Sequence, residues 1–139
     1  MNNFSINFEL PTAEEFVNLR LLAKMSARDV RGIEIGLVNS NHVVTFRDGD
    51  LLVGMGRVIG DSATTFQITD IAVHPDYQGK GIGKSIMAEL INWLEENATP
   101  NSYISLVADG DAKSLYEKFG FEVTTPYSIG MHRFANKGD

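Results

Sequence analysis

The chain has 139 residues, a length that favours one domain, and its 43% hydrophobic and 22% charged residues argue against disorder. It contains no cysteine, which excludes disulfides, thiolate metal sites and a cysteine nucleophile. The net charge is −6 and the basic residues are scattered, whereas a nucleic-acid binder needs a basic stripe, so no nucleic-acid partner is expected.

The N-terminal sequence MNNFSINFEL lacks a basic region followed by an apolar run, so no signal peptide is predicted. No apolar run approaches the ~20 residues that a membrane-spanning helix needs. The sequence therefore predicts a single cytoplasmic domain over residues 1–139, with no membrane partner.

The N-terminal third favours helices after a short candidate strand at residues 8–10. Residues 11–24 predict a helix, because Thr12 and Glu15 have the spacing of a capping box. Ser26 with Asp29 suggests the start of a second helix, which we expect to end in the sequence Asn-Ser-Asn. Its apolar residues recur at helical spacing: Val30, Ile33 and Leu37.

The middle of the chain changes to β-branched and aromatic runs separated by turns. Asp48 and Gly49 predict a hairpin, since glycine supplies the positive φ that tight turns require. The runs form an antiparallel meander of about three strands: residues 42–47, 51–60 and 64–73.

Helical spacing returns at residues 81–97, and then helices and strands alternate. Residues 103–108 predict a short strand buried on both faces, and residues 111–121 a short helix with Gly120 as a left-handed cap. Residues 121–134 can supply a final pair of strands. This order predicts a mixed α/β sheet with a parallel pair where a helix crosses over.

The loop DYQGKGIGKS ends like a nucleoside-triphosphate loop, but that motif requires glycine where this chain has Gln78. The dinucleotide pattern also fails, because Lys84 or Ile86 occupies the position of its third glycine. A glycine-rich turn that leads into a helix still presents backbone N–H groups and the helix dipole to an anion such as a diphosphate. The alternative is a plain helix-entry turn.

The sequence Gln-Gly-Lys-Gly-Ile-Gly resembles the acetyl-coenzyme A signature of the GNAT N-acetyltransferases, with Gln78, Gly81 and Gly83 at its three defining positions. DIAVHPDYQGKGIGKSIM is similar to the strand, loop and helix of that family, and AKSLYEKFGFE to its later helix. The resemblance covers about residues 66–123. It implies a mostly antiparallel sheet of six to seven strands with about four helices.

The resemblance implies acetyl-coenzyme A (acetyl-CoA) as co-substrate, and no spacing of His, Asp and Glu resembles a metal site. Backbone amides of residues 79–84 would hold the coenzyme diphosphate, and the strand end at residues 71–73 would pair with the pantetheine arm where the sheet splays. The full set of expected coenzyme-binding residues is Ile71, Ala72, Val73, Gln78, Gly79, Lys80, Gly81, Ile82, Gly83, Lys84, Ala112 and Tyr116.

Three residues are catalytic candidates. By its match to the family, Tyr116 would protonate the leaving thiolate, although its apolar surroundings also suit a core tyrosine. Gln67 occupies the position of the family's frequent glutamate, so the base would be Asp70, activated by burial, unless Asp70 only bonds a neighbouring strand or loop. Asp109 would bind or deprotonate the amine, or else cap the helix near Asp111.

The segments ITDIAV, ISLVAD and GMHR also resemble the plant and cyanobacterial arylalkylamine (serotonin) acetyltransferases, which suggests an amine acceptor. The predicted function is acetyl transfer from acetyl-CoA to a primary amine of a small molecule, by direct attack. The alternatives are acetylation of a protein N-terminus or lysine, and a coenzyme-binding sensor without catalysis. The C-terminal strands could also form the edge of a homodimer.

Overall fold

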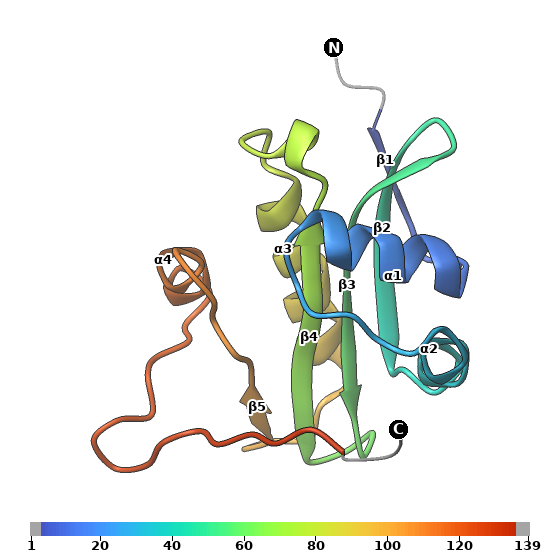
Figure 1. Cartoon of the computed structure of the whole chain (residues 1–139). Coiled ribbons are helices and arrows are strands. Elements are labelled where there is room, and N and C mark those ends of the chain that lie inside the picture. The colour runs from blue at the N-terminus through green and yellow to red at the C-terminus, as the bar shows by residue number, and fades with distance from the viewer. Residues whose placement is uncertain (1–3, 136–139) are drawn as a thin grey trace.

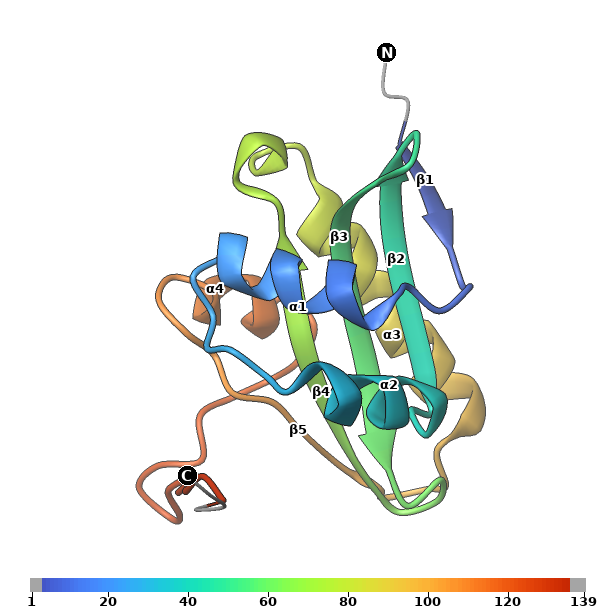
Figure 2. The same cartoon turned by 45° about the vertical axis from the view of Figure 1, so that its right-hand side comes forward.

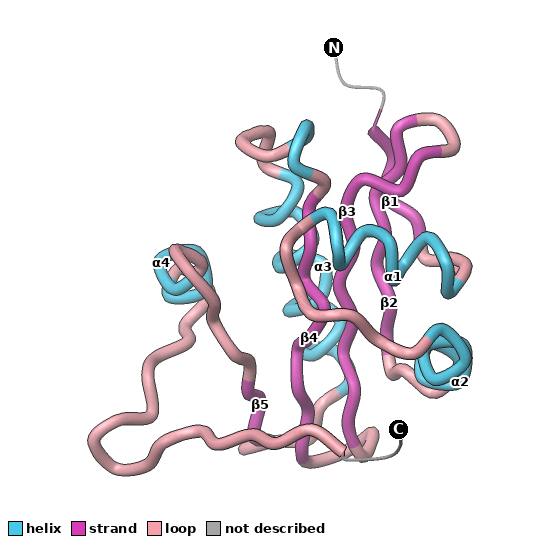
Figure 3. Tube along the Cα trace, viewed as in Figure 1, coloured by secondary structure: helices cyan, strands magenta, loops and turns pink. Residues whose placement is uncertain are grey.

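A twisted sheet runs through the centre of the computed structural model, which describes residues 4–135 (Figure 1). Two parts of the predicted domain lie outside that range, Met1–Asn3 and residues 136–139. The first of them begins the segment from which no signal peptide is predicted. Figure 3 distinguishes the helices and strands by colour. In chain order they are β1 Phe4–Asn7, α1 Ala13–Leu22, α2 Val30–Val38, β2 His42–Asp48, β3 Leu51–Gly60, β4 Thr65–Val73, the 3-10 turn η1 Pro75–Tyr77, α3 Ile82–Asn97, β5 Tyr103–Ser105 and α4 Lys113–Glu117.

The five strands follow one another across the sheet in the order β1-β2-β3-β4-β5. The first three neighbouring pairs are antiparallel, which confirms the predicted meander, and β4 pairs with β5 in parallel after the α3 crossover. Gly49 turns the β2–β3 hairpin with a φ of 60°, a left-handed conformation that favours glycine. No helix within residues 4–135 is long and apolar enough to cross a membrane.

Helices cover both faces of the sheet, with α1 and α2 on one side and α3 on the other (Figures 1 and 2). The apolar core is therefore divided into two clusters instead of one. The α1 and α2 cluster includes Phe16, Leu19, Ile33, Leu37, Met55 and Ala72. The α3 cluster includes Val53, Val58, Phe66, Ile68, Ile86 and Leu90.

Two glycines of β3 let α3 lie close against the sheet. A Cβ at Gly54 would stand 2.6 Å from Cγ2 of Ile82, and a Cβ at Gly56 would stand 2.7 Å from Cγ2 of Ile86. Any larger residue would push the helix outward, because core side chains are already close-packed. These contacts fix the first turns of α3, which begin directly after the glycine-rich loop.

The start of α1 confirms the predicted capping box. The Thr12 hydroxyl accepts the Glu15 N–H, and the Glu15 carboxylate accepts the Thr12 N–H in return. In α2 the cap is Asp29, which accepts the Gly32 N–H, so the helix begins after Asp29 and Ser26 lies before it. The candidate strand at residues 8–10 is wrong, because the side chain of Asn7 accepts the backbone N–H two residues later and ends β1 at Asn7.

The C-terminal part departs from the prediction. Strand β5 ends at Ser105, and its residues are exposed or half-buried instead of buried on both faces. No strand forms at residues 121–134, so five strands within residues 4–135 replace the expected six to seven. The physical reason is pairing, because a strand needs a neighbour for its backbone groups and this segment lies beside none. Gly120 lies two residues beyond the Lys118 cap of α4 and has the expected left-handed conformation, with a φ of 90°.

Candidate active site

The sheet opens between β4 and β5. These strands pair in parallel only from Thr65 and Tyr103 to Gln67 and Ser105. Beyond that point β4 continues to Val73, while the chain after β5 turns away towards α4 (Figure 1). Residues 68–73, here called the free edge of β4, therefore have β3 as their only strand neighbour within the described chain. The expected splaying of the sheet is confirmed.

A β-bulge at Asp70 reshapes this free edge. The β3–β4 register passes from Met55 opposite Ala72 to Arg57 opposite Thr69, so one residue of β3 faces two of β4. Asp70 accommodates the extra residue with a φ of 59°, a left-handed conformation that is uncommon for a residue with a side chain. Bulges of this kind redirect the peptide groups and side chains around them.

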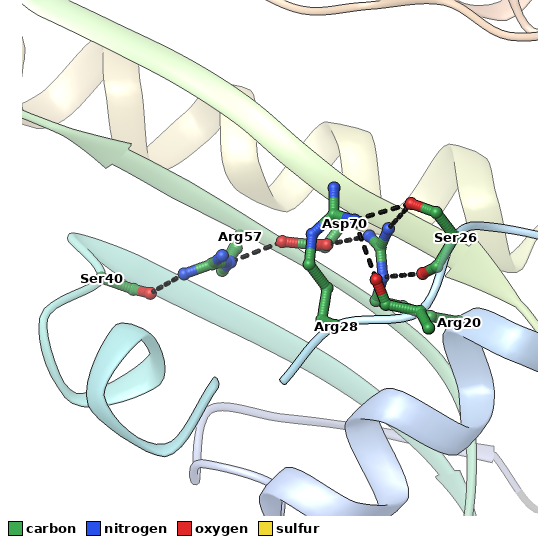
Figure 4. Close-up of polar contacts among 7 residues, drawn as sticks. Arg20, Ser26, Arg28, Ser40, Arg57 and Asp70 are labelled. Atoms are coloured by element: carbon green, nitrogen blue, oxygen red, sulfur yellow. Dashed lines mark hydrogen bonds and ion pairs between the residues drawn. The ribbon is translucent and has the colours of Figure 1, made fainter. Parts of the chain in front are cut away.

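The Asp70 side chain points away from the free edge into a buried ion-pair cluster (Figure 4). One of its oxygens accepts from Nη1 of Arg20 on α1, and the other accepts from Nε of Arg57 on β3 at 2.6 Å. Arg20 also donates to the Ser26 carbonyl, and Arg57 donates to the Ser40 hydroxyl at 3.1 Å. Asp70 is 6% exposed and Arg20 3%, so both charges of that pair are removed from water, whereas Arg57 is half-buried.

This cluster bears on the two interpretations of Asp70. Its carboxylate bonds a neighbouring strand and helix, and both oxygens are occupied by guanidinium groups. Burial lowers the pKa of Arg20 from its ordinary value, and the Asp70 charge opposes that effect. Sequence reasoning missed Arg20 and Arg57. The available signal was a lone charge within each of the apolar runs Leu-Arg-Leu-Leu and Met-Gly-Arg-Val-Ile.

The glycine-rich loop is folded back onto the end of β4. The His74 ring accepts the Asp76 N–H through Nδ1 at 3.1 Å and thereby organises η1. The Gln78 side chain then donates to the Val73 carbonyl at 3.2 Å. The first residue of the family signature thus ties the loop to the last residue of the free edge.

Two residues of this loop depend on being glycine. Gly79 and Gly81 have φ values of 79° and 83°, and a Cβ at either position would meet nothing within 4 Å. The backbone conformation requires them, and the space beside them is open to a ligand. Gly81 precedes α3 without a side-chain cap, and the Ser85 N–H is the first to bond back, to the Gly81 carbonyl at 3.0 Å.

The first amides of α3, up to residue 84, precede the helical ladder and are available to an anion. The exposed side chains of Lys80 and Lys84 flank them with positive charge. Because the glycines permit close backbone approach, this arrangement fits a diphosphate. The loop also adjoins a cavity of about 140 Å³ lined by Phe4, Phe46, Lys80, Gly81, Ile82 and Ser85.

Tyr116 lies on α4, which packs beside the start of α3. A Cβ on Gly83 would stand 3.9 Å from Leu115, the residue before it. Tyr116 is 8% exposed and belongs to the apolar cluster under α3. Burial raises the pKa of its phenol, and the charge of Asp109 raises it further. The phenol therefore holds its proton at neutral pH.

Asp109 lies close enough to Tyr116 to influence its titration, and its carboxylate is exposed. At the start of α4 it is the Asp109 carbonyl that accepts the Ala112 N–H, at 3.1 Å, and the helix has no side-chain cap. The carboxylate is thus not used to cap α4. The structure brings Asp109 and Tyr116 together on one side of the opening, whereas Asp70 faces the helices α1 and α2.

The comparisons with known proteins agree with this geometry. The model of the acetyltransferase (GNAT) domain matches residues 39–123. The chain is 35% identical over 98 residues to the uncharacterized N-acetyltransferase ycf52 of Pyropia yezoensis, covering 68% of this chain and 55% of that protein. It is 31% identical over 91 residues to the [Ribosomal protein bS18]-alanine N-acetyltransferase of Haemophilus influenzae, covering 66% and 56%.

Among solved structures, a protein of unknown function from meticillin-resistant Staphylococcus aureus, described as a probable acetyltransferase, has a TM-score of 0.91 and 42% sequence identity. That match covers 95% of this chain and 99% of the other, so it extends into the C-terminal segment. The chain spans about half the length of the curated relatives it matches, 55% of the first. The family model covers more than half of the sequence. The chain therefore belongs to the GNAT family of acetyltransferases.

Proposed function

We propose that this protein transfers the acetyl group of acetyl-CoA to a primary amine of a small molecule. One observation carries the proposal: the glycine-rich anion site lies at the end of a free strand edge, with a protonated tyrosine beside it. That arrangement can hold a long phosphorylated donor at one end and place its reactive end in the opening of the sheet.

The donor fits the described residues in two places. The N–H groups of residues 79–84, with the left-handed glycines among them, suit the diphosphate of coenzyme A. The free edge at Ile71, Ala72 and Val73 offers backbone groups to an extended amide-containing chain, as an added strand would. Ala112, directly before α4, and Tyr116, on α4, would line the other side of the slot.

In the proposed reaction the amine nitrogen forms a bond to the thioester carbonyl carbon, and the bond from that carbon to sulfur breaks. Tyr116 gives its phenolic proton to the departing sulfur, and its raised pKa ensures that the proton is present before the reaction. The exposed Asp109 accepts the proton lost by the amine, directly or through a water molecule. Backbone amides beside the Asp70 bulge steady the carbonyl oxygen as charge develops on it.

We assign Asp70 a positioning role in this scheme. Its two guanidinium partners leave no free oxygen for a substrate amine. They instead hold the left-handed bulge in place against α1 and β3, and the bulge sets the direction of the amides along the free edge. Arg20 and Arg57 would act through Asp70 in the same way.

A peptide amine is the second candidate acceptor. The Haemophilus influenzae relative is named for the alanine of a ribosomal protein, and the amine of a terminal alanine is also a primary amine. The same chemistry therefore serves both acceptors. What differs is whether the surface around the opening accommodates a chain of residues or a single small molecule.

The test is a turnover assay that follows free thiol from acetyl-CoA against two acceptor panels, small primary amines and peptides with a free N-terminal alanine. Release of thiol with a small amine supports the proposal, and turnover with peptides alone favours the second candidate. Calorimetry measures coenzyme binding separately. Binding without turnover on either panel would instead identify a non-catalytic coenzyme sensor, and absence of binding would refute the coenzyme site itself.

A further inference from the structure

The last part of the described chain is an exposed apolar segment, here called the C-terminal arm, residues 122–135. Every residue of the arm is exposed to solvent. Tyr127 is 96% exposed, Met131 90% and Ile129 69%, and Val123 and Phe134 are exposed as well. Such a concentration of apolar side chains is unusual on the surface of a monomer and is typical of a protein-binding surface.

The arm has some internal order of its own. The Ser128 N–H donates to the Thr124 carbonyl at 3.1 Å, and the Thr124 hydroxyl donates to the Ser128 carbonyl at 3.0 Å. The segment therefore bends back on itself between these residues. Figure 2 shows it hanging below α4 and apart from the sheet. One contact to the body is the Arg28 guanidinium, 5.9 Å from the centre of the Phe134 ring.

A groove with an apolar floor lies elsewhere on the molecule, between the end of α3 and strand β5. It has a volume of about 390 Å³. Ile91, Leu94, Ala98 and Ile104 form its apolar part, Glu95 adds a negative charge, and Thr99, Asn101 and Ser102 make most of the rest of the lining polar. The arm of the same chain does not fill it.

Strand β5 beside this groove ends the sheet. Its outer edge has no strand neighbour within residues 4–135, and Tyr103 on it is 59% exposed. An unpaired edge next to an apolar groove is a ready template for another extended segment. The sequence of the arm has the β-branched and aromatic residues of short strands, divided by Pro126 and Gly130, and these strands have no partner within the described chain.

We propose that the C-terminal arm of one protomer packs into the groove and along the outer edge of β5 of a second copy of this chain. The match is chemical on both sides, because the apolar side chains of the arm suit the apolar part of the lining, and the positive charge of Arg133 on the arm suits the negative charge of Glu95 in the groove. Each copy has one arm and one groove, so two copies satisfy each other and the assembly closes as a symmetric dimer. The exchange supplies the strands that the sheet of a single chain lacks.

The first experiment measures molar mass by light scattering at increasing concentration for three full-length proteins: wild type, Ile129→Asp in the arm, and Val38→Asp as control. Val38 is an equally exposed apolar residue on α2, away from arm and groove. Wild type and control are expected at twice the chain mass. The dissociation constant of the arm variant's dimer should be at least about ten-fold higher than that of wild type. Its circular dichroism spectrum should be unchanged. A monomeric wild type, or an arm variant that dimerises as well as the control, would overturn the proposal.

The second experiment uses the absence of cysteine in the chain. A Glu95→Cys protein is mixed, under oxidising conditions, with each of Tyr127→Cys, Ile129→Cys and Met131→Cys. A disulfide between two chains is expected for at least one pair, and none when Val38→Cys replaces Glu95→Cys. Chains that carry both a groove and an arm cysteine should also link to each other. If those double variants instead form internal disulfides as monomers, the arm folds into its own groove and exchange is refuted.

Discussion

Asp70 is the residue on which the geometry of the free edge depends most. It occupies a left-handed conformation and pairs with two guanidinium groups, the buried one of Arg20 on α1 and the half-buried one of Arg57 on β3. Removing one partner of a buried ion pair costs much more than the pair contributes, because the remaining charges stay desolvated.

We therefore expect Asp70→Ala to lower the free energy of unfolding by about 3–5 kcal/mol, measured by urea denaturation. Asp70→Asn keeps an acceptor oxygen and should lose less. The matched control is Arg47→Ala, which breaks the more exposed Arg47–Glu15 pair and should cost about 1 kcal/mol. Equal losses for Asp70→Ala and Arg47→Ala would contradict the assignment of a buried, essential charge at Asp70.

Gly81 permits a direct test of the diphosphate site. In Gly81→Ala the new methyl group enters open space beside the loop, at a φ of 83° that costs about 1 kcal/mol for a residue with a Cβ. We expect the KM for acetyl-CoA to rise about ten-fold. Gly49→Ala is the control, because Gly49 also has a positive φ and open space but lies in the β2–β3 hairpin. Gly49→Ala should lose similar stability and keep its KM for acetyl-CoA. A rise of KM in this control would show that the effect of Gly81→Ala is not specific to the diphosphate site.

Tyr116→Phe separates chemistry from packing. Phenylalanine fills the same apolar site, so the melting temperature should change little, whereas kcat should fall about 100-fold because the leaving sulfur loses its proton donor. The KM for acetyl-CoA should stay within about two-fold. The measurement is steady-state kinetics with the best acceptor from the panels. An unchanged kcat would reduce Tyr116 to a core tyrosine.

At the scale of elements, β2 and α3 are joined by a stack of rings that is sensitive to pH. His42 on β2 lies between Phe8 and Trp93, with ring centroids 5.5 Å away on each side. Its Nε2 is buried, without a hydrogen bond, 3.8 Å from a Glu89 carboxylate oxygen. Burial lowers the pKa of His42, and the Glu89 charge opposes that effect without cancelling it.

Because the folded pKa of His42 lies below its unfolded value of about 6.5, the unfolded chain binds the proton first as pH falls. The contribution of His42 to stability is therefore complete above pH 6.5 and decreases below it. We expect the urea midpoint of wild type to drop more between pH 7.5 and 5 than that of His42→Phe, which keeps the stack without a titrating group. Identical drops would show that the other titrating groups account for the pH dependence.

Elements determined by neighbouring residues were predictable from the sequence, and those that need a distant partner were not. The capping box, the Asp48–Gly49 hairpin and the glycine-rich loop each depend on residues a few positions apart. Asp70 meets an arginine 50 positions away, which no local pattern reveals. Residues 121–134 have the composition of strands, yet strand formation also requires a neighbouring strand edge. Composition does not say which strand supplies that edge.

At the scale of the whole molecule, exchange of C-terminal arms would link stability to concentration. A dimer that forms only from folded chains shifts the unfolding equilibrium by mass action. The melting temperature of wild type should therefore rise as protein concentration increases from about 1 to 100 μM, while that of Ile129→Asp stays nearly constant. Differential scanning calorimetry at several concentrations measures this. A wild-type melting temperature that does not depend on concentration would argue against the exchanged dimer.

The short parallel pairing of β4 with β5 has a consequence for the order of folding. Strands β2 to β4 are joined by adjacent hairpins over much of their length, whereas β5 is held to the sheet by three residue pairs that α3 separates in sequence. Closing that long loop is slow compared with zipping the hairpins, so the meander forms first and β5 docks late. Amide hydrogens of β5 should accordingly exchange with deuterium by local opening long before those of β3, and the reacting end of the site is assembled last.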